Sequence, residues 1–241
     1  MRIEALEPFF DEGLIESVIR QVKSGKEATV YMCRARPWTG AEFFAAKVYR
    51  PREERSFRND AMYREGRMAV LKERDRRAVA KKTGWGREVL FGQWLFQEYE
   101  NLKVLHAAGA RVPRPVARGE SAVLLEWIGD ESGAAPHLRE VRPSHDDAAA
   151  LLDVLVGQVE LFLRENLVHG DLSEYNVLFW QGGLTVIDLP QMVDPRFNHS
   201  AQRLLTRDLE NVCRYFARFG VQREGRWVAQ GLWDRWLRSE L

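Results

Sequence analysis

The sequence predicts an α+β protein in two lobes, a small antiparallel β-rich N-terminal lobe and a reduced helical C-terminal lobe. Segments of β-rich composition separated by turn residues fill the first half, whereas apolar-rich segments with helical spacing fill the second. A chain of 241 residues with 45% hydrophobic and 29% charged residues can bury the core of one large domain or of two lobes. We expect a short N-terminal extension over residues 1–23, an N-terminal lobe over 24–128 and a C-terminal lobe over 129–241.

Strands are predicted mainly in the N-terminal lobe. Residues 28–34 and 43–49 are rich in β-branched and aromatic side chains, and the turn residues at 37–40 between them predict a hairpin. A third apolar strand is expected over 122–128. In the C-terminal lobe, Gly182-Gly183 is a strong turn signal and predicts a second hairpin, whose strands are expected at 177–180 and 184–187.

Helices are predicted from apolar residues that recur at helical spacing. Residues 92–108 carry Leu95, Tyr99, Leu102 and Leu105 before Gly109, which is expected to end the helix. Later in the chain, Ser144 is a suitable N-cap before a helix over 148–163. Two closing helices are expected over 201–219 and 226–237; Trp227, Trp233 and Trp236 in the second of these are interpreted as core packing.

Composition excludes several classes of protein. A formal net charge of +1 argues against a globally basic nucleic-acid binder, and no stretch approaches the roughly 20 apolar residues of a membrane span. Cys33 and Cys213 lie far apart without zinc-like spacing, so we expect buried thiols. With no signal peptide evident near Met1, the sequence favours a cytoplasmic protein without membrane contact.

One segment carries acidic and amide residues in an order that indicates phosphoryl transfer. It reads His169-Gly-Asp171-Leu-Ser-Glu-Tyr-Asn176 and is followed by an apolar run and Asp188. Phosphoryl-transfer enzymes place an Asp, an Asn five residues later and a second Asp in this order. Asp171 would orient the acceptor hydroxyl or take its proton, while Asn176 and Asp188 supply the hard oxygen ligands that Mg²⁺ prefers. Asp and Asn are also ordinary turn residues, but the ordered set favours the functional interpretation.

A lysine within an apolar strand predicts a phosphate-binding pair. An ammonium is costly in such a place without a partner or an anionic ligand, so Lys47 in Ala45-Ala46-Lys47-Val48 needs one. Glu98, on the predicted helix 92–108, is placed to pair with it. The segment from Ser24 to Ala28 precedes a predicted strand and could cover phosphate with backbone amides, although a Ser-Gly turn is more often only a turn.

These motifs together resemble the RIO family of atypical serine/threonine protein kinases over residues 24–220. The segments that carry the resemblance are Ser24-Gly-Lys-Glu-Ala-Thr-Val-Tyr31, Gln97-Glu98-Tyr-Glu-Asn101-Leu102, Glu126-Trp-Ile-Gly129, Val168-His-Gly-Asp-Leu-Ser-Glu-Tyr-Asn176 and Ile187-Asp-Leu-Pro-Gln191. The resemblance implies a two-lobed protein-kinase-like fold, ATP with Mg²⁺ or Mn²⁺, and no long activation segment. Only 53 residues follow Asp188, too few for an ordinary kinase substrate-binding lobe. We expect a compact member without the N-terminal winged-helix domain.

By this resemblance, the site residues take the roles of their family counterparts. Lys47 and Asp171 would be catalytic, Asn176 would bind metal, and Asp188 would be catalytic, bind metal and act as a candidate phosphoacceptor. The residues that would contact ATP are Ser24, Lys26, Glu27, Val30, Lys47, Glu98, Glu126 and Ile128. The family members often act as ATPase-driven switches on ribosome precursors, so the resemblance implies protein kinase activity, ATPase activity or both.

A basic segment near residues 50–87 has no assigned role. It holds thirteen Lys or Arg against six Asp or Glu, with interspersed aromatic residues. Contact with RNA phosphates in a ribosomal precursor is one interpretation. A solvated helix over 61–82 is the other, and it is favoured. In the family this segment is a loop that carries autophosphorylated serine, and Ser56 is its only serine.

Two alternative functions stay open at this point. The sequence His-Gly-Asp at 169–171 also occurs in aminoglycoside and choline kinase-like enzymes, so a small-molecule phosphotransferase is one alternative. A non-catalytic interaction module, in which bound ATP only sets the conformation, is the other. The Ser24 to Tyr31 loop and Glu126-Trp-Ile-Gly129 argue against the first alternative, and the intact set of Asp171, Asn176 and Asp188 argues against the second.

Overall fold

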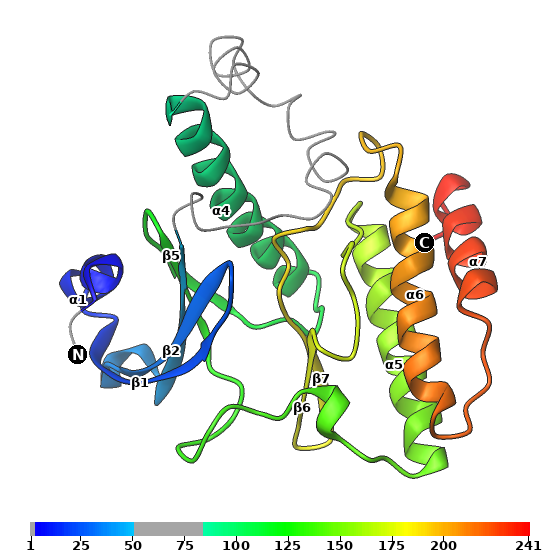
Figure 1. Cartoon of the computed structure of the whole chain (residues 1–241), viewed down its shortest axis with the longest axis horizontal. Helices are drawn as coiled ribbons and strands as arrows, with labels where there is room; N and C mark the ends of the chain where they lie inside the picture. The colour runs from blue at the N-terminus through cyan, green and yellow to red at the C-terminus, as the bar shows by residue number, and fades with distance from the viewer. Residues whose placement is uncertain (1–2, 51–83) are drawn as a thin grey trace. The chain divides into compact units, whose positions relative to one another are not determined.

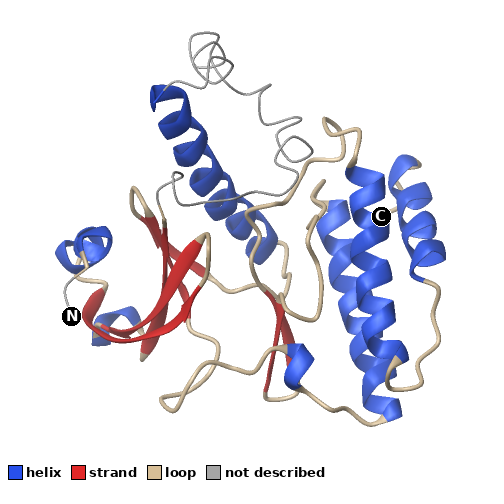
Figure 2. Cartoon of the chain, in the orientation of Figure 1, coloured by secondary structure: helices blue, strands red, loops and turns tan. Residues whose placement is uncertain are grey.

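The computed structural model describes residues 3–50 and 84–241, which form two compact units. The first unit contains the described residues up to 50 together with 84–103 and 113–134. The described residues of the second are 104–112 and 135–241. Strands dominate the first unit and helices dominate the second (Figure 2). The predicted α+β class is therefore confirmed.

A five-stranded antiparallel sheet forms the first unit, with its strands in the order β1-β2-β3-β5-β4; β1, β2 and β5 are labelled in Figure 1. The strands are β1 (Ile15–Ser24), β2 (Ala28–Ala35), β3 (Phe43–Tyr49), β4 (Pro115–Arg118) and β5 (Ala122–Glu126). The central strand β3 pairs with β2 on one side and β5 on the other, so that Lys47 lies opposite Val30 and Val123.

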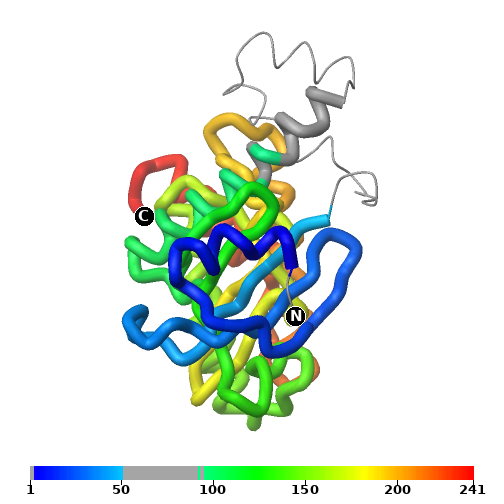
Figure 3. The backbone as a smooth tube through the Cα atoms, turned by 90° about the vertical axis from the view of Figure 1, so that its left-hand side faces the viewer, coloured from blue at the N-terminus to red at the C-terminus, as the bar shows by residue number. Residues whose placement is uncertain are grey.

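Short helical segments and one long helix complete the first unit. The N-terminal residues form η1 (Glu4–Leu6) and α1 (Glu7–Asp11), and η2 (Pro37–Thr39) connects β2 to β3. Leu6 and Phe9 are fully buried in an apolar cluster with residues of β1, β2, β3 and β5. Figure 3 shows this N-terminal segment lying across the sheet. The long helix is α4 (Gly84–Ala107), whose residues 84–103 belong to this unit.

Three helices and a small hairpin form the second unit. The helices are α5 (His145–Arg164), α6 (Ala201–Ala217) and α7 (Gly225–Leu237), which lie side by side, and η5 (Leu138–Glu140) precedes them (Figure 1). The hairpin pairs β6 (Val177–Trp180) with β7 (Gly183–Val186). Ser144 caps α5 as predicted, because its hydroxyl accepts a hydrogen bond from the backbone N–H of Asp147.

Most predicted elements are confirmed, with corrections at their ends. The strand expected over 122–128 ends at Glu126, and the helix expected to begin at residue 92 begins at Gly84. The helix considered over 61–82, like most of the basic segment, lies outside the described residues. No helix within residues 3–50 and 84–241 combines the length and apolar character needed to span a bilayer.

The sequence prediction did not find the first strand of the sheet. Residues 15–23, which were expected to belong to an N-terminal extension, form β1 with Ser24 and pair with β2. Only Ile15 and Val18 of this strand are buried, and its register is interrupted by irregularities. An edge strand with charged side chains lacks the regular apolar alternation from which strands are predicted. The segment from Ser24 to Ala28 was predicted to precede the first strand. It instead forms the tip of the hairpin that joins β1 to β2.

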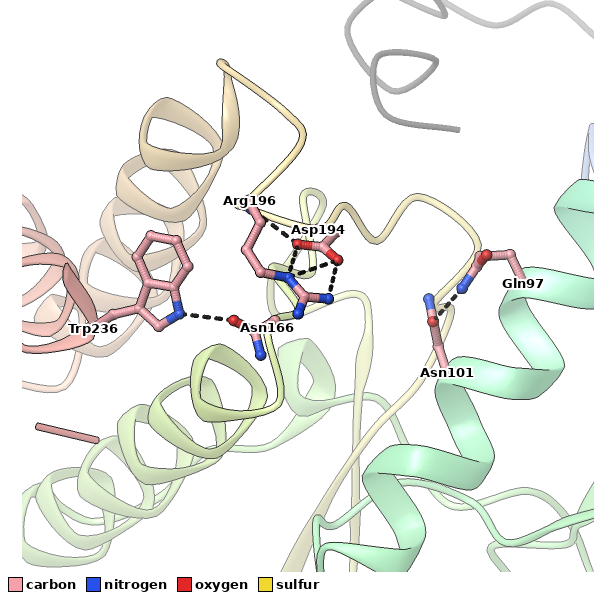
Figure 4. A network of polar contacts seen from close by, with 6 residues as sticks. All are labelled: Gln97, Asn101, Asn166, Asp194, Arg196 and Trp236. Atoms are coloured by element: carbon pink, nitrogen blue, oxygen red, sulfur yellow. Dashed lines mark hydrogen bonds and ion pairs between the residues drawn. The ribbon is translucent and has the colours of Figure 1, made fainter. Parts of the chain in front are cut away.

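The tryptophans of α7 are less buried than predicted. Trp227 is 70% exposed, so its interpretation as a core residue is wrong. Trp233 and Trp236 are half-buried and their ring centroids lie 4.9 Å apart. The indole Nε1 of Trp236 donates to the side-chain oxygen of Asn166 at 3.2 Å (Figure 4). Both predicted buried thiols, Cys33 and Cys213, are confirmed as free and buried.

The start of α7 packs against the backbone of α6 at Gly225. A Cβ atom on this glycine would lie 2.6 Å from the Leu209 carbonyl oxygen and 2.7 Å from Glu210 Cα. We expect Gly225→Ala to destabilise the fold by about 1–3 kcal/mol, because two helix backbones must separate. Denaturant unfolding measures this loss. Gly231→Ala on the same helix is the matched control: it meets open space and should stabilise the protein by about 0.5–1 kcal/mol. Equal effects at the two positions would contradict the packing argument.

Candidate active site

In the first unit, Lys47 and Glu98 form a buried ion pair. The Lys47 ammonium nitrogen lies 2.8 Å from Glu98 Oε1, and the two side chains are 14% and 2% exposed. Glu98 lies on the same face of α4 as the buried residues Leu95 and Leu102, so its carboxylate points into the protein and needs a cation. The pairing expected from the sequence is therefore present.

Lys47 shares one face of the sheet with an apolar cross-strand row. Val30 on β2 and Val123 on β5 lie directly opposite it in the antiparallel register. Directly opposed residues project from the same face of a sheet. The structure therefore brings together Val30, Lys47 and Glu98 from the predicted set.

The tip of the β1–β2 hairpin is held by Arg50. The Arg50 guanidinium donates to Ser24 Oγ at 2.7 Å, and its backbone N–H donates to the Glu27 carbonyl oxygen at 2.9 Å. Ser24 Oγ also lies 3.4 Å from the hydroxyl of the buried Thr29. Lys26 at the tip is exposed. The predicted phosphate loop is thus fastened at both ends by a residue that the sequence reasoning did not single out.

Glu126, which was predicted to contact ATP, is the last residue of β5. Its backbone N–H donates to the Arg114 carbonyl oxygen at 2.9 Å, and its carboxylate accepts from the Arg114 N–H at 3.0 Å. Ile128 follows two residues later, beyond the end of the strand. The Glu126 N–H already donates to Arg114. The Glu126 backbone could therefore bind an adenine only through the Glu126 carbonyl oxygen.

In the second unit, Asp171 and Asn176 lie together in the loop before β6. The Asn176 side-chain amide nitrogen donates to the Asp171 carbonyl oxygen at 2.8 Å and lies 3.4 Å from Asp171 Oδ2. Both partners are acceptors, so the amide nitrogen must face them and the amide oxygen is directed elsewhere. The Ile187 N–H donates to the Asn176 carbonyl oxygen at 2.9 Å, which ties this loop to the residue before Asp188.

Asp171 and Asp188 lie near enough to influence each other electrostatically. Desolvation raises the pKa of Asp171, the nearby Asp188 carboxylate raises it further, and Arg207 and the Asn176 hydrogen bond lower it. Asp171 nevertheless keeps an exposed surface. Asp188 has a φ of 67°, a left-handed conformation that non-glycine residues rarely adopt. Strained backbone of this kind is common at functional sites.

His169 connects the two segments that carry these acids. Its Nδ1 accepts a hydrogen bond from the Asp171 N–H at 3.3 Å, and its Nε2 lies 3.2 Å from the Ile187 carbonyl oxygen. A ring nitrogen that accepts from an N–H carries no proton, so the proton of the neutral imidazole is on Nε2, where it can be donated to Ile187. The buried His169 thus holds the backbone before Asp188 against the backbone of Asp171.

Asp208 on α6 binds the backbone of the loop that carries Asp171. Its carboxylate accepts from the Gly170 N–H at 2.7 Å and from the Leu172 N–H at 3.0 Å, on either side of Asp171. Burial raises the pKa of Asp208 to about 7, opposed by these two backbone donors and by Arg207. The Arg207 guanidinium also donates to the Gly170 carbonyl oxygen. Asp208 therefore fixes the position of the Asp171 backbone.

We expect Asp208→Asn to destabilise the protein by about 1–3 kcal/mol, because one buried N–H would face an amide NH₂ group instead of an acceptor. Turnover should fall with it, since the loop that carries Asp171 loses a fixed contact. Denaturant unfolding and ATP turnover are the measurements. Asp153→Asn is the matched control: its exposed carboxylate pairs with Arg223 at 2.6 Å, and its loss should cost less than about 1 kcal/mol. A variant at 208 with the stability and turnover of wild type would contradict this role.

Asp208 and Arg50 are functional candidates to which the sequence reasoning gave no role, although the segment from Arg207 to Asn211 also resembles the family. Asp208 lies within the apolar stripe of α6, among Leu204, Leu205 and Leu209. A lone carboxylate in such a stripe is itself a signal, because it must find buried donors. Arg50 gave no comparable signal, since it opens a segment with many other basic residues.

Comparison with known proteins shows the family of the chain. Residues 29–226 match the RIO domain family. The chain is 32% identical over 221 residues to the RIO-type serine/threonine-protein kinase Rio1 of Haloferax volcanii, covering 92% of this chain and 70% of that protein. It is also 30% identical over 217 residues to the serine/threonine-protein kinase RIO1 of Caenorhabditis elegans, covering 87% of this chain.

The extent of the match differs between relatives. The chain spans 39% of the Caenorhabditis elegans protein and 40% of the serine/threonine-protein kinase rio1 of Schizosaccharomyces pombe, to which it is 27% identical. The antiparallel sheet followed by helices is consistent with a kinase-like fold. With the RIO domain covering most of its length, the chain belongs to the RIO family of serine/threonine kinases.

Proposed function

We propose that this chain transfers the γ-phosphoryl group of ATP to a serine of a protein, with Asp171 as the group that accepts the proton of the attacking hydroxyl. Family membership implies a kinase that uses ATP. The observation that carries the finer proposal is the linked set of Asp171, Asn176 and Asp188, held together by hydrogen bonds through His169 and Ile187.

Asp171 is suited to act as a base. Its exposed surface leaves room for an acceptor hydroxyl. Asp208 and His169 fix the backbone on both sides of it, so the carboxylate is positioned before a substrate arrives.

The residues fit a divalent cation. The Asn176 amide nitrogen is committed to Asp171, which leaves its hard amide oxygen for a metal. Asp188 would supply the carboxylate, and Mg²⁺ usually keeps several waters in addition to one or two such ligands. We propose that Asn176 and Asp188 hold Mg²⁺ or Mn²⁺, which would neutralise charge on the phosphates of bound ATP.

The residues proposed to contact the phosphates and the adenine of ATP lie in the first unit. The Lys47 ammonium, oriented by Glu98 at 2.8 Å, would contact the α- and β-phosphates. Ser24, Lys26 and Glu27 at the hairpin tip would cover the phosphates with backbone amides, and Val30 would contact the adenine. The Glu126 carbonyl and the Ile128 N–H would bind its edge.

A second route uses Asp188 itself. In this route a bond forms between the γ-phosphorus and an Asp188 carboxylate oxygen while the bond to the leaving ADP oxygen breaks, and water then releases phosphate. Such an ATPase cycle would suit a switch on a ribosomal precursor. Co-sedimentation of the protein with ribosomal particles, compared in the presence of ATP and ADP, tests that link.

One experiment separates these chemistries. The protein is incubated with γ-labelled ATP and Mg²⁺, and the products are analysed by mass spectrometry. Label on serine, for instance on Ser56 in the segment outside the described residues, indicates a kinase; acid-labile label on Asp188, lost in Asp188→Ala, indicates the ATPase route. Phosphorylation of an aminoglycoside or choline but never of protein would favour a small-molecule phosphotransferase. Wild-type protein that neither transfers label nor releases phosphate would contradict the proposal.

A further inference from the structure

Four exposed arginines of the second unit come from two segments that meet at the buried Tyr215. Two come from the segment before α5 and two from the end of α6; they are Arg139, Arg142, Arg214 and Arg218, here named the arginine cluster. None of them belongs to the proposed catalytic set. Arginines near a helix C-terminus complement the helix dipole, but this does not account for Arg139 and Arg142, which lie outside α6.

The buried Tyr215 is the centre of the cluster. Its hydroxyl donates to the Leu138 carbonyl oxygen at 2.5 Å and lies 3.2 Å from the Val141 carbonyl oxygen. The Arg142 guanidinium donates to the same Val141 carbonyl oxygen at 3.3 Å, and Arg218 lies 5.7 Å from the centroid of the Tyr215 ring. These shared contacts hold Arg142 and Arg218 on one surface.

Arg139 and Arg214 attach this surface to the catalytic loop. The Arg139 backbone N–H donates to the Glu174 carbonyl oxygen at 3.1 Å, and its guanidinium lies 5.1 Å from the centroid of the Tyr175 ring. Arg214 contacts the Asn211 side chain at 3.4 Å, and Asn211 in turn donates to the Leu172 carbonyl oxygen at 3.3 Å.

The cluster has an excess of positive charge. Glu140 pairs with Arg139 at 3.3 Å. Burial is the main cause that raises the pKa of Tyr215, and the nearby Glu174 carboxylate raises it further. Within residues 3–50 and 84–241, no ion pair involves Arg142 or Arg218. Two guanidinium groups on a shared surface are therefore available to an anionic ligand that presents two acceptors.

Arg139 connects the cluster to the chain close to the proposed acceptor position. Glu174, which contacts Arg139, follows Asp171 by three residues, and three residues span at most about 10 Å. A side chain a few positions from a serine held at Asp171 can cover that distance. Guanidinium groups bind carboxylates through paired, charge-assisted hydrogen bonds.

We propose that the arginine cluster binds acidic side chains of the protein substrate beside the serine that is phosphorylated. This inference rests on the proposed protein kinase function and names the substrate class: serines flanked by glutamate or aspartate. An acidic peptide fits better than RNA, because Glu140 and Glu174 interrupt the positive surface that a continuous phosphate chain would follow. In addition, one face of the exposed Tyr175 ring is covered by Arg139 and is closed to base stacking.

The test compares wild type with Arg142→Gln/Arg218→Gln on two peptides, each with one serine, flanked either by glutamates or by glutamines. Fluorescence anisotropy gives the dissociation constants of labelled peptides, and ADP production gives kcat and KM. We expect the double variant to raise the dissociation constant and KM of the glutamate peptide about tenfold, as two exposed charge pairs would. The KM for ATP and the values for the glutamine peptide should stay unchanged.

Matched controls keep the outcome interpretable. Arg226→Gln/Arg238→Gln removes two exposed arginines from α7 and its end and should bind the glutamate peptide like wild type; unfolding curves show whether each variant is folded. If wild type binds the glutamate peptide but transfers no phosphate, the docking inference stands and the kinase proposal fails. Equal binding of the two peptides by wild type, or equal losses in both double variants, would overturn the inference. So would a loss of uridine oligonucleotide binding in Arg142→Gln/Arg218→Gln without any change in peptide binding.

Discussion

Asp171→Asn is expected to lower kcat for phosphoryl transfer by about 10²- to 10⁴-fold, the contribution typical of a positioned general base. An amide cannot take the proton of the acceptor hydroxyl. The backbone contacts that hold this loop, from Asn176 to the Asp171 carbonyl and from the Asp171 N–H to His169, do not depend on the carboxylate. Fold and ATP affinity should therefore be preserved. Steady-state kinetics and nucleotide binding by calorimetry measure the two effects.

The control for this variant is Asp146→Asn, which removes one negative charge from a fully exposed side chain of the same unit. It should leave kcat unchanged. If Asp171→Asn retained wild-type kcat, Asp171 could not be the base. If both ATP binding and stability fell with kcat, the residue would have a structural role instead.

Lys47→Ala is expected to have the largest effect in the first unit, because it removes both the proposed phosphate contact and an ion-pair partner of the buried Glu98 carboxylate. Breaking a buried ion pair by removing one partner typically costs 3–5 kcal/mol, and with Lys47 14% exposed we expect about 3 kcal/mol. ATP use should weaken at the same time. Denaturant unfolding and the KM for ATP are the measurements.

A matched lysine and a double variant separate the two contributions. Lys103→Ala removes an exposed partner of Glu100, also on α4, and should cost less than about 1 kcal/mol. Lys47→Met/Glu98→Leu removes the pair together and should recover most of the stability, while ATP use remains impaired. Recovery of ATP use in that double variant would contradict the assignment of Lys47 to the phosphates.

Elements with strong local patterns could be predicted from the sequence. The strands at 43–49 and 177–180 and the Ser144 cap agree with the structure, because β-branched residues and capping hydroxyls act through their near neighbours. The strand β1 could not be found this way. Its stability comes from pairing with β2 and from burial of Ile15 and Val18 beneath the N-terminal segment, which are contacts that local composition does not reveal.

In the candidate site, too, contacts indicated by local sequence could be predicted and contacts made only by tertiary packing could not. The pairing of Lys47 with Glu98 could be predicted because an ammonium in an apolar strand requires a partner. The support of the Asp171 loop by Asp208 could not, since those residues are far apart in sequence and only the packing of α6 brings them together. The roles of Ser24, Lys26, Glu27, Val30, Glu126 and Ile128 towards ATP stay predictions.

The contact at Gly225 offers a route to a temperature-sensitive enzyme. Leu209 and Glu210, against which this glycine packs, immediately follow Asp208, whose carboxylate holds the backbone on both sides of Asp171. A side chain at position 225 would therefore strain α6 at the turn that supports the loop carrying Asp171, without touching any residue assigned to ATP, metal or substrate. A cell carrying such an allele would keep the protein at low temperature and lose it on warming, which allows its cellular role to be studied without disabling its chemistry first.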